Sequence, residues 1–174
     1  DRTGAAHGER VGLVDWRIFM SLVTGGSGST TPAPTPTPTP APAPTTNGTL
    51  ALEVTTSVLN VRDGVMGNVI GQAQSGQRFV ASASRSGWYQ IDFGARKGWV
   101  SGSYVRRVAA TAEVVTASAL NVRTQAATSG GIIATTTSGQ RHVRLQQSGD
   151  WYLVQFDHRR GWVHGGYTSS VSLR

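Results

Sequence analysis

Residues 88–93, Trp-Tyr-Gln-Ile-Asp-Phe, place a large apolar side chain at every second position. A period of two with one apolar face is typical of a β-strand that is buried on one side. The stretch recurs at residues 151–156 as Trp-Tyr-Leu-Val-Gln-Phe, where Leu153 makes the second face less polar. Short segments of this kind are separated by glycine-containing turns such as Ser86-Gly87. This pattern predicts an all-β fold of small barrels rather than alternating strands and helices.

Other motifs recur in the same order along the chain. They are Leu-Asn-Val-Arg at 59–62 and 120–123, Ser-Gly-Gln-Arg at 75–78 and 138–141, and Gly-Trp-Val at 98–100 and 161–163. The first motif recurs after 61 residues and the others after 63, so the second copy carries two extra residues between its first two motifs. An insertion confined to one interval marks a loop, which we place at 63–67 against 124–130. The chain therefore holds two copies of one small β-domain.

The region before the repeats has a different composition. All seven prolines stand at alternate positions from Pro32 to Pro44, which forbids helix and sheet and favours an extended polyproline II conformation. We expect residues 28–49 to be a Pro/Thr-rich linker. Residues 1–27 are too few to bury a core, and we expect them to be the C-terminal remnant of an upstream domain. The two repeats then occupy residues 50–109 and 111–174.

Composition excludes several classes of function. The chain has 16 Lys+Arg, 9 Asp+Glu and no cysteine, and its net charge of +7 falls entirely within the two repeats. Without cysteine there is no disulfide, thiolate metal site or cysteine nucleophile. No hydrolase, zinc-protease or phosphate-loop motif occurs, and acidic residues are too sparse for a glycosidase pair. We therefore expect no catalytic residue, no metal and no cofactor, and the absence of any 18-residue apolar run predicts no transmembrane segment.

Both repeats resemble the bacterial SH3-like (SH3b) domain family. The second repeat carries Ala-Ser-Ala-Leu-Asn-Val-Arg at 117–123, Gly-Asp-Trp-Tyr at 149–152, Gly-Trp-Val at 161–163 and a closing Tyr167; the first matches at 59–62, 87–89, 98–100 and Tyr104. The resemblance implies two SH3-like barrels in tandem that act as non-catalytic targeting modules. In this family such modules are commonly attached to cell-wall hydrolases and other envelope proteins, and their usual ligands are peptidoglycan peptides.

The first candidate ligand residues are Trp88 and Trp151, which lie opposite the apolar face of their predicted strands. An indole there offers a flat apolar platform with one hydrogen-bond donor, although it could also simply close the barrel beneath a loop. Tyr104 and Tyr167 resemble the closing tyrosine that lines the peptide groove of eukaryotic SH3 domains, with plain packing as the alternative. Further candidates are Trp99 and Trp162, as a groove floor or core edge.

Polar candidates flank the apolar residues of the Leu-Asn-Val-Arg motif: Asn60, Arg62, Asn121 and Arg123. An arginine here could clamp a peptide carboxylate with two hydrogen bonds. The structural alternative is an arginine that donates to loop carbonyls instead.

These observations favour a cell-wall targeting module that binds peptidoglycan or anionic cell-wall polymers. The alternative is a protein–protein interaction or structural module of an envelope protein. Basic residues come in pairs rather than in a stripe, so we expect no nucleic-acid partner. We expect a secreted or cell-surface location, a monomer, and a parent protein that is a cell-wall hydrolase. The Pro-rich linker is not expected to dock on the barrels, since none of its prolines has the Pro-x-x-Pro spacing.

Overall fold

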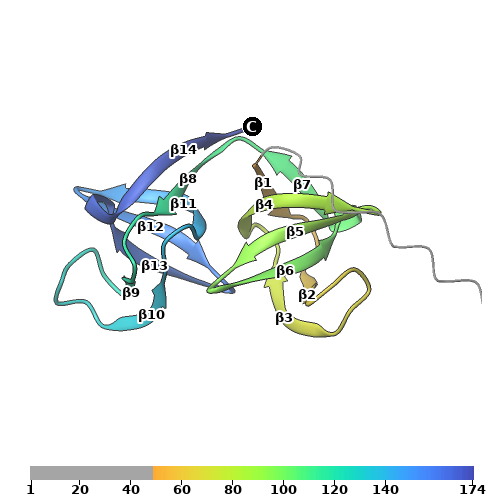
Figure 1. The fold of residues 1–174 in the computed structure, drawn as a ribbon, viewed down its shortest axis with the longest axis horizontal. Coiled ribbons are helices and arrows are strands. Elements are labelled where there is room, and N and C mark those ends of the chain that lie inside the picture. Colours follow the sequence, from red (N-terminus) through yellow and green to blue (C-terminus); the bar gives the residue numbers. More distant parts are fainter. Residues whose placement is uncertain (1–48) are drawn as a thin grey trace, which may run out of the picture. The chain divides into compact units, whose positions relative to one another are not determined.

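The computed structural model describes residues 49–174, which form two β-barrels, one in each repeat (Figure 1). Within these residues there is no α-helix, and the predicted tandem all-β fold is confirmed. The predicted upstream remnant at 1–27 and nearly all of the predicted linker at 28–49 lie outside the described residues.

The two barrels have the same succession of elements. The first consists of β1 (Leu50–Val54), β2 (Val58–Arg62), β3 (Val69–Gln74), β4 (Arg78–Arg85), β5 (Trp88–Phe93), β6 (Arg96–Ser101), the 3-10 turn η1 (Gly102–Tyr104) and β7 (Val105–Val108). The second consists of β8 (Ala110–Val115), β9 (Leu120–Arg123), β10 (Ile132–Thr136), β11 (Arg141–Ser148), β12 (Trp151–Phe156), β13 (Arg159–His164), η2 (Gly165–Tyr167) and β14 (Thr168–Leu173).

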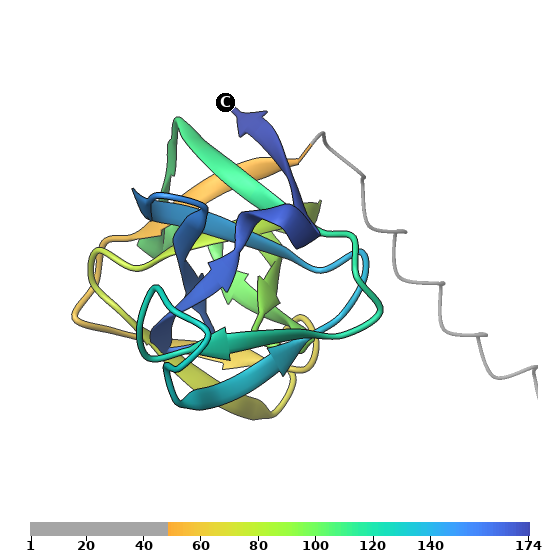
Figure 2. The same ribbon diagram turned by 90° about the vertical axis from the view of Figure 1, so that its left-hand side faces the viewer.

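Strand order repeats along with the elements. The first sheet runs β3-β2-β6-β5-β4-β1-β7 and the second β10-β9-β13-β12-β11-β8-β14, with antiparallel pairing throughout. Figure 2 shows the strands of the second barrel curling around one another, with the loop between β9 and β10 projecting from them. That loop covers residues 124–131, two more than its counterpart at 63–68. The two-residue insertion therefore lies in a loop of the second barrel and leaves the order of the strands unchanged.

The alternation of residues 88–93 sets the core of the first barrel. Ile91 and Phe93 are almost fully buried, and they pack with Val61 of β2 and Leu52 of β1. Trp88 lies on the opposite face and is half-buried. Burial of several large aliphatic and aromatic side chains, each worth about 1.5–3 kcal/mol, is the main stabilising term for a domain of this size.

The second barrel has a comparable apolar cluster but carries two polar residues at core positions. Glu113 of β8 lies opposite His142 of β11, where the first barrel pairs Leu52 with Phe79. Glu113 is 0% exposed and accepts hydrogen bonds from Thr168 Oγ1 at 2.7 Å and Ser170 Oγ at 2.9 Å. The carboxylate is tolerated because its oxygens are satisfied.

His142 occupies the place of a core phenylalanine. Its ring lies 5.4 Å from the ring of Phe156, and its Nε2 is 2.7 Å from Thr136 Oγ1. Burial lowers the pKa of His142 to about 4, a shift that the negative charge of Asp92 and a backbone hydrogen bond at Gln155 only partly oppose. The imidazole is therefore neutral in the folded protein at neutral pH.

The outer faces of the two barrels meet in a third apolar cluster, formed by Ala51, Val80, Ala112, Val143 and Leu173. Asp92, on the polar face of β5, is only 8% exposed and lies beside Lys97 and 3.3 Å from Arg141 of the second barrel. Gln77 also donates to the carbonyl of His158 at 2.9 Å. Strand alternation assigns Asp92 to the side away from the core, and the neighbouring barrel is what buries it there.

Candidate ligand-binding hollows

Two hollows, one in each barrel, are lined mostly by equivalent residues. The first, of about 310 Å³, is lined by Thr56, Val58, Leu59, Asn60, Arg62, Trp88, Ser101 and Tyr104. The second, of about 330 Å³, is lined by Ala119, Leu120, Asn121, Arg123, Thr128, Trp151, His164 and Tyr167. Eight of the ten candidate residues from the sequence thus come together, four in each hollow.

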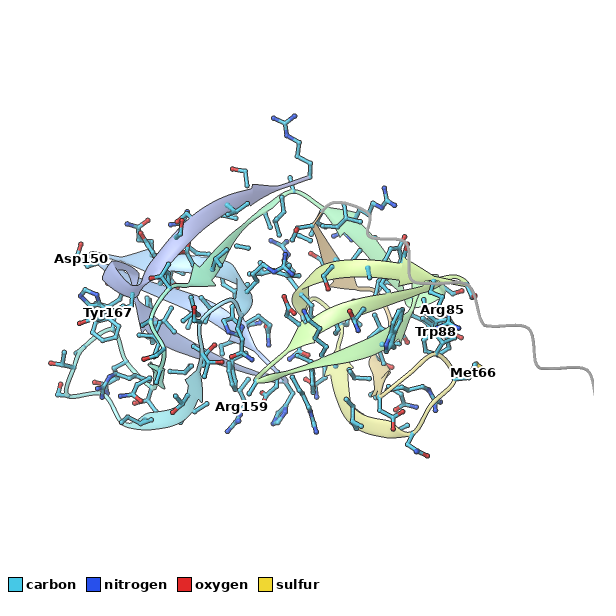
Figure 3. The ribbon with its side chains drawn as sticks, in the orientation of Figure 1. Met66, Arg85, Trp88, Asp150, Arg159 and Tyr167 are labelled. Atoms are coloured by element: carbon cyan, nitrogen blue, oxygen red, sulfur yellow. The ribbon has the colours of Figure 1, made fainter. Side chains whose placement is uncertain are left out.

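The indole of each hollow comes from a strand end. Trp88 begins β5 and faces Ser101, the last residue of β6. On its other side Trp88 faces Arg85, the last residue of β4 (Figure 3). In the second barrel Trp151 begins β12 and faces His164. Since Trp88 and Trp151 are half-buried, each keeps part of its ring at the surface of its hollow.

The tyrosine of each hollow is carried by the 3-10 turn that follows. Tyr104 and Tyr167 are 50% and 54% exposed. The turn is tied to the neighbouring hairpin by backbone hydrogen bonds, from Gly102 N to Gly87 O at 2.8 Å and from Gly165 N to the carbonyl of Asp150 at 2.7 Å. Glycine is required at residue 102 because a Cβ there would lie 2.6 Å from the carbonyl oxygen of Gly87.

The arginines hold the adjacent loops. Arg62 Nη1 donates to the carbonyl of Gly67 at 2.6 Å, and Arg123 Nη1 donates to that of Gly130 at 2.7 Å. Each guanidinium has five N–H donors, so several remain for a ligand. Both roles weighed from the sequence, the loop anchor and the hollow-lining cation, are compatible with this position.

Trp99 and Trp162 are not among the residues that line either hollow. Trp99 is 8% exposed and lies opposite Arg62 in the sheet, as Trp162 lies opposite Arg123. Because directly paired residues of neighbouring strands share a face of the sheet, each of these tryptophans lies on the same face as its arginine. Neither forms the floor of a hollow, and the burial of Trp99 fits the core edge that the sequence suggested as the alternative.

Ser101 and His164 line the hollows but are not among the sequence candidates. The His164 ring meets the Trp151 ring edge-on, with centroids 5.1 Å apart, and lies 5.6 Å from the ring of Tyr167. The sequence could have identified them if the two strands that contain tryptophan in each repeat had been paired as a hairpin. In that hairpin Ser101 lies directly opposite Trp88, and His164 lies directly opposite Trp151.

The rest of the described surface is basic and carries local ion pairs. Glu53 lies between Arg78, at 2.7 Å, and Arg106, and its hydrogen bonds, first to Arg106 and then to Arg78, lower its pKa. Within residues 49–174 no three His, Asp or Glu side chains gather closely enough to hold a metal ion. The same part of the chain contains no helix long and apolar enough to cross a membrane.

Comparison with known proteins agrees with this fold. The sequence model of the bacterial SH3 domain matches residues 57–106 and 118–169, together more than half of the chain. No curated protein sequence gives a significant match.

Among solved structures, NlpC1 and NlpC2 from Trichomonas vaginalis are similar, with 10% and 11% sequence identity and TM-scores of 0.34 and 0.33. The matches cover 74% and 70% of this chain and 48% of each of those chains, so this chain spans about half the length of either structure. The assignment comes from the family match over both repeats. The chain belongs to the bacterial SH3 domain family, with one domain in each repeat.

Proposed function

We propose that this chain is a non-catalytic cell-wall targeting module that binds peptidoglycan peptides through its two hollows. The observation that carries the proposal is the recurrence, in both barrels, of an indole, a phenol ring, an arginine and an asparagine around one hollow. We further propose that it is part of a secreted cell-wall hydrolase. Family membership supports this wider context.

The chemistry of the hollow suits an extended peptide. The faces of Trp88 and Tyr104 offer apolar platforms to a peptide backbone and its small side chains. Arg62 and Asn60 supply donors for carbonyl and carboxylate oxygens. Because Arg62 is already held by the carbonyl of Gly67, its guanidinium loses little freedom when a ligand binds.

Two sites on one chain favour attachment to a polymer. The barrels are joined only by Ala109, between β7 and β8, and they share an apolar contact. When one hollow is occupied, the second is presented to the wall at a high effective concentration. Weak binding at each hollow then gives stronger retention on a repeating ligand than on a single peptide.

Co-sedimentation of the full chain with peptidoglycan stripped of anionic polymers tests the proposal. We expect the wild-type chain to pellet at physiological salt, and a folded Trp88→Ala/Trp151→Ala variant to stay in the supernatant. Trp162→Phe is the matched control, since it alters an indole outside the hollows and should pellet like the wild type.

Two outcomes would contradict the proposal. If the double variant pelleted as the wild type does, the hollows would not be the binding sites. If the wild type failed to pellet, peptidoglycan peptides would not be the ligand. In the second case, pelleting with walls that retain their anionic polymers would assign the attachment to the net charge of +7 instead.

A further inference from the structure

The two hollows differ in the segment that carries the tyrosine. In the first barrel this segment is Ser-Gly-Ser-Tyr at residues 101–104, and in the second it is His-Gly-Gly-Tyr at residues 164–167. Ser101 makes no side-chain hydrogen bond at the start of η1, whereas the side chain of His164 accepts one from the backbone N–H of Gly166. The turn that positions Tyr167 is therefore capped and the turn that positions Tyr104 is not.

The hydrogen bond fixes the protonation pattern of His164. Gly166 N lies 3.1 Å from His164 Nδ1, and a backbone N–H can only donate, so Nδ1 is the acceptor. In a neutral imidazole the other nitrogen then carries the proton. The His164 ring lies near the rings of both Trp151 and Tyr167 and lines the hollow, so it adds an Nε2–H donor on that side.

The cap packs tightly against the glycine two residues after the histidine. A Cβ on Gly166 would lie 3.1 Å from Nδ1 and 3.2 Å from Cε1 of His164, closer than ordinary van der Waals contact. The first barrel has Ser103 at the equivalent position, where a side chain would crowd a histidine placed at residue 101. His164 and Gly166 therefore act as a pair, and neither residue is present in the first barrel.

We propose that His164 and Gly166 preorganise the second hollow and make it the tighter of two peptide-binding sites, with the His164 Nε2–H donating to an oxygen of the bound peptide. This inference rests on the proposed function. The ring of His164 packs against Trp151 and Tyr167, and its cap holds the turn between them. Both contacts reduce the ordering that a ligand would otherwise have to impose on the second hollow.

A titration of the full chain with a soluble disaccharide–tetrapeptide muropeptide separates the two sites, because Trp88 and Trp151 each give one indole N–H signal by NMR. We expect the Trp151 signal to report a Kd roughly threefold to tenfold lower than the Trp88 signal, the size of effect that a capping hydrogen bond supports. The variant His164→Ser/Gly166→Ser should raise the second Kd to the level of the first. Ser101→His/Ser103→Gly should lower the first.

Amide hydrogen exchange tests the cap without any ligand. The Gly166 N–H should exchange more slowly than the Ser103 N–H, and His164→Ser should remove this protection. His164→Asn keeps an acceptor within reach of the same N–H, so it should retain protection at Gly166 while losing the ring between Trp151 and Tyr167.

The two measurements separate failure of the inference from failure of the proposed function. If both indoles report the same Kd, the inference is overturned and the proposed function stands. The same holds if the second hollow remains the tighter site in the His164→Ser/Gly166→Ser and Ser101→His/Ser103→Gly variants. If neither indole responds although Gly166 is protected, the peptide ligand is overturned for both hollows and the ranking falls with it. If Gly166 exchanges as fast as Ser103, the cap itself is overturned.

Discussion

In the first barrel Leu52 and Phe79 face each other across β1 and β4, whereas in the second barrel the same two positions hold Glu113 and His142. The strands, their order and their register survive this exchange of an apolar pair for two ionisable residues. The fold therefore tolerates different side chains at these two positions when the volume is filled and the buried carboxylate of Glu113 is hydrogen-bonded.

Glu113 and His142 have hydrogen-bond partners on neighbouring strands. Thr168 and Ser170 of β14 donate to Glu113, while the first barrel has Val105 and Arg107 at the equivalent places. His142 has the Thr136 hydroxyl at Nε2 and packs against the ring of Phe156. The stability of the second barrel should therefore depend on pH through a residue of its core.

The largest expected difference between the barrels appears in mild acid. Because the pKa of His142 is near 4 in the folded state and its ordinary value is 6.5, the unfolded chain binds the extra proton first as pH falls. The second barrel should lose stability as pH drops from about 6.5 to about 4, by about 3 kcal/mol in total. Urea unfolding at several pH values, followed separately through the Trp88 and Trp151 indoles, measures the loss in each barrel.

His142→Phe is the matched control for this pH dependence, since it restores the residue type of the first barrel and should abolish the slope between pH 6.5 and 4.5. The first barrel has its own acid-sensitive contact at Glu53, whose pKa is lowered by Arg106 and Arg78. The stability from Glu53 is present above pH 4.5 and is lost only below it. If both barrels lost equal free energy of unfolding between pH 6.5 and 4.5, His142 would not be the cause of the pH dependence.

A smaller effect should be shared by the barrels. A Cβ on Gly98 would lie 2.3 Å from Cγ1 of Val61, and one on Gly161 would lie 2.3 Å from Cγ1 of Val122. Gly98→Ala and Gly161→Ala should each destabilise their own barrel by about 2 kcal/mol, since these valines are fully buried and cannot move aside. Urea unfolding measures both.

The cost at Gly161 should be at least as large as at Gly98, because its Cβ would also meet Ile133 at 2.9 Å. Gly64→Ala serves as the control, since a Cβ there meets nothing within 4 Å. A Gly161→Ala variant as stable as the wild type would show that the second core is packed more loosely than the contacts indicate.

The recurring motifs were sufficient to predict the paired barrels, and the candidates drawn from the sequence include half of the residues that line each hollow. Strand alternation pointed to Trp88 and the resemblance to SH3 domains pointed to Tyr104, and both line one hollow. Ser101 and His164 were missed because their position depends on strand register, which short motifs do not specify.

Contacts between the barrels were beyond sequence reasoning for a different reason. Alternation puts Asp92 on the polar face of its strand, and nothing in a period of two says that a second domain will cover that face. Likewise the pattern around His142 does not distinguish a surface histidine from one that replaces a core phenylalanine. Its partners Thr136 and Phe156 lie on other strands.

The number of peptide sites per chain decides whether both hollows bind peptide. Calorimetric titration of the full chain with the soluble muropeptide should give two sites for the wild type, one for Trp88→Ala, one for Trp151→Ala and none for the double variant. Two sites that persist in the folded double variant, or no site in the wild type, would contradict the claim that the paired hollows bind peptidoglycan peptides.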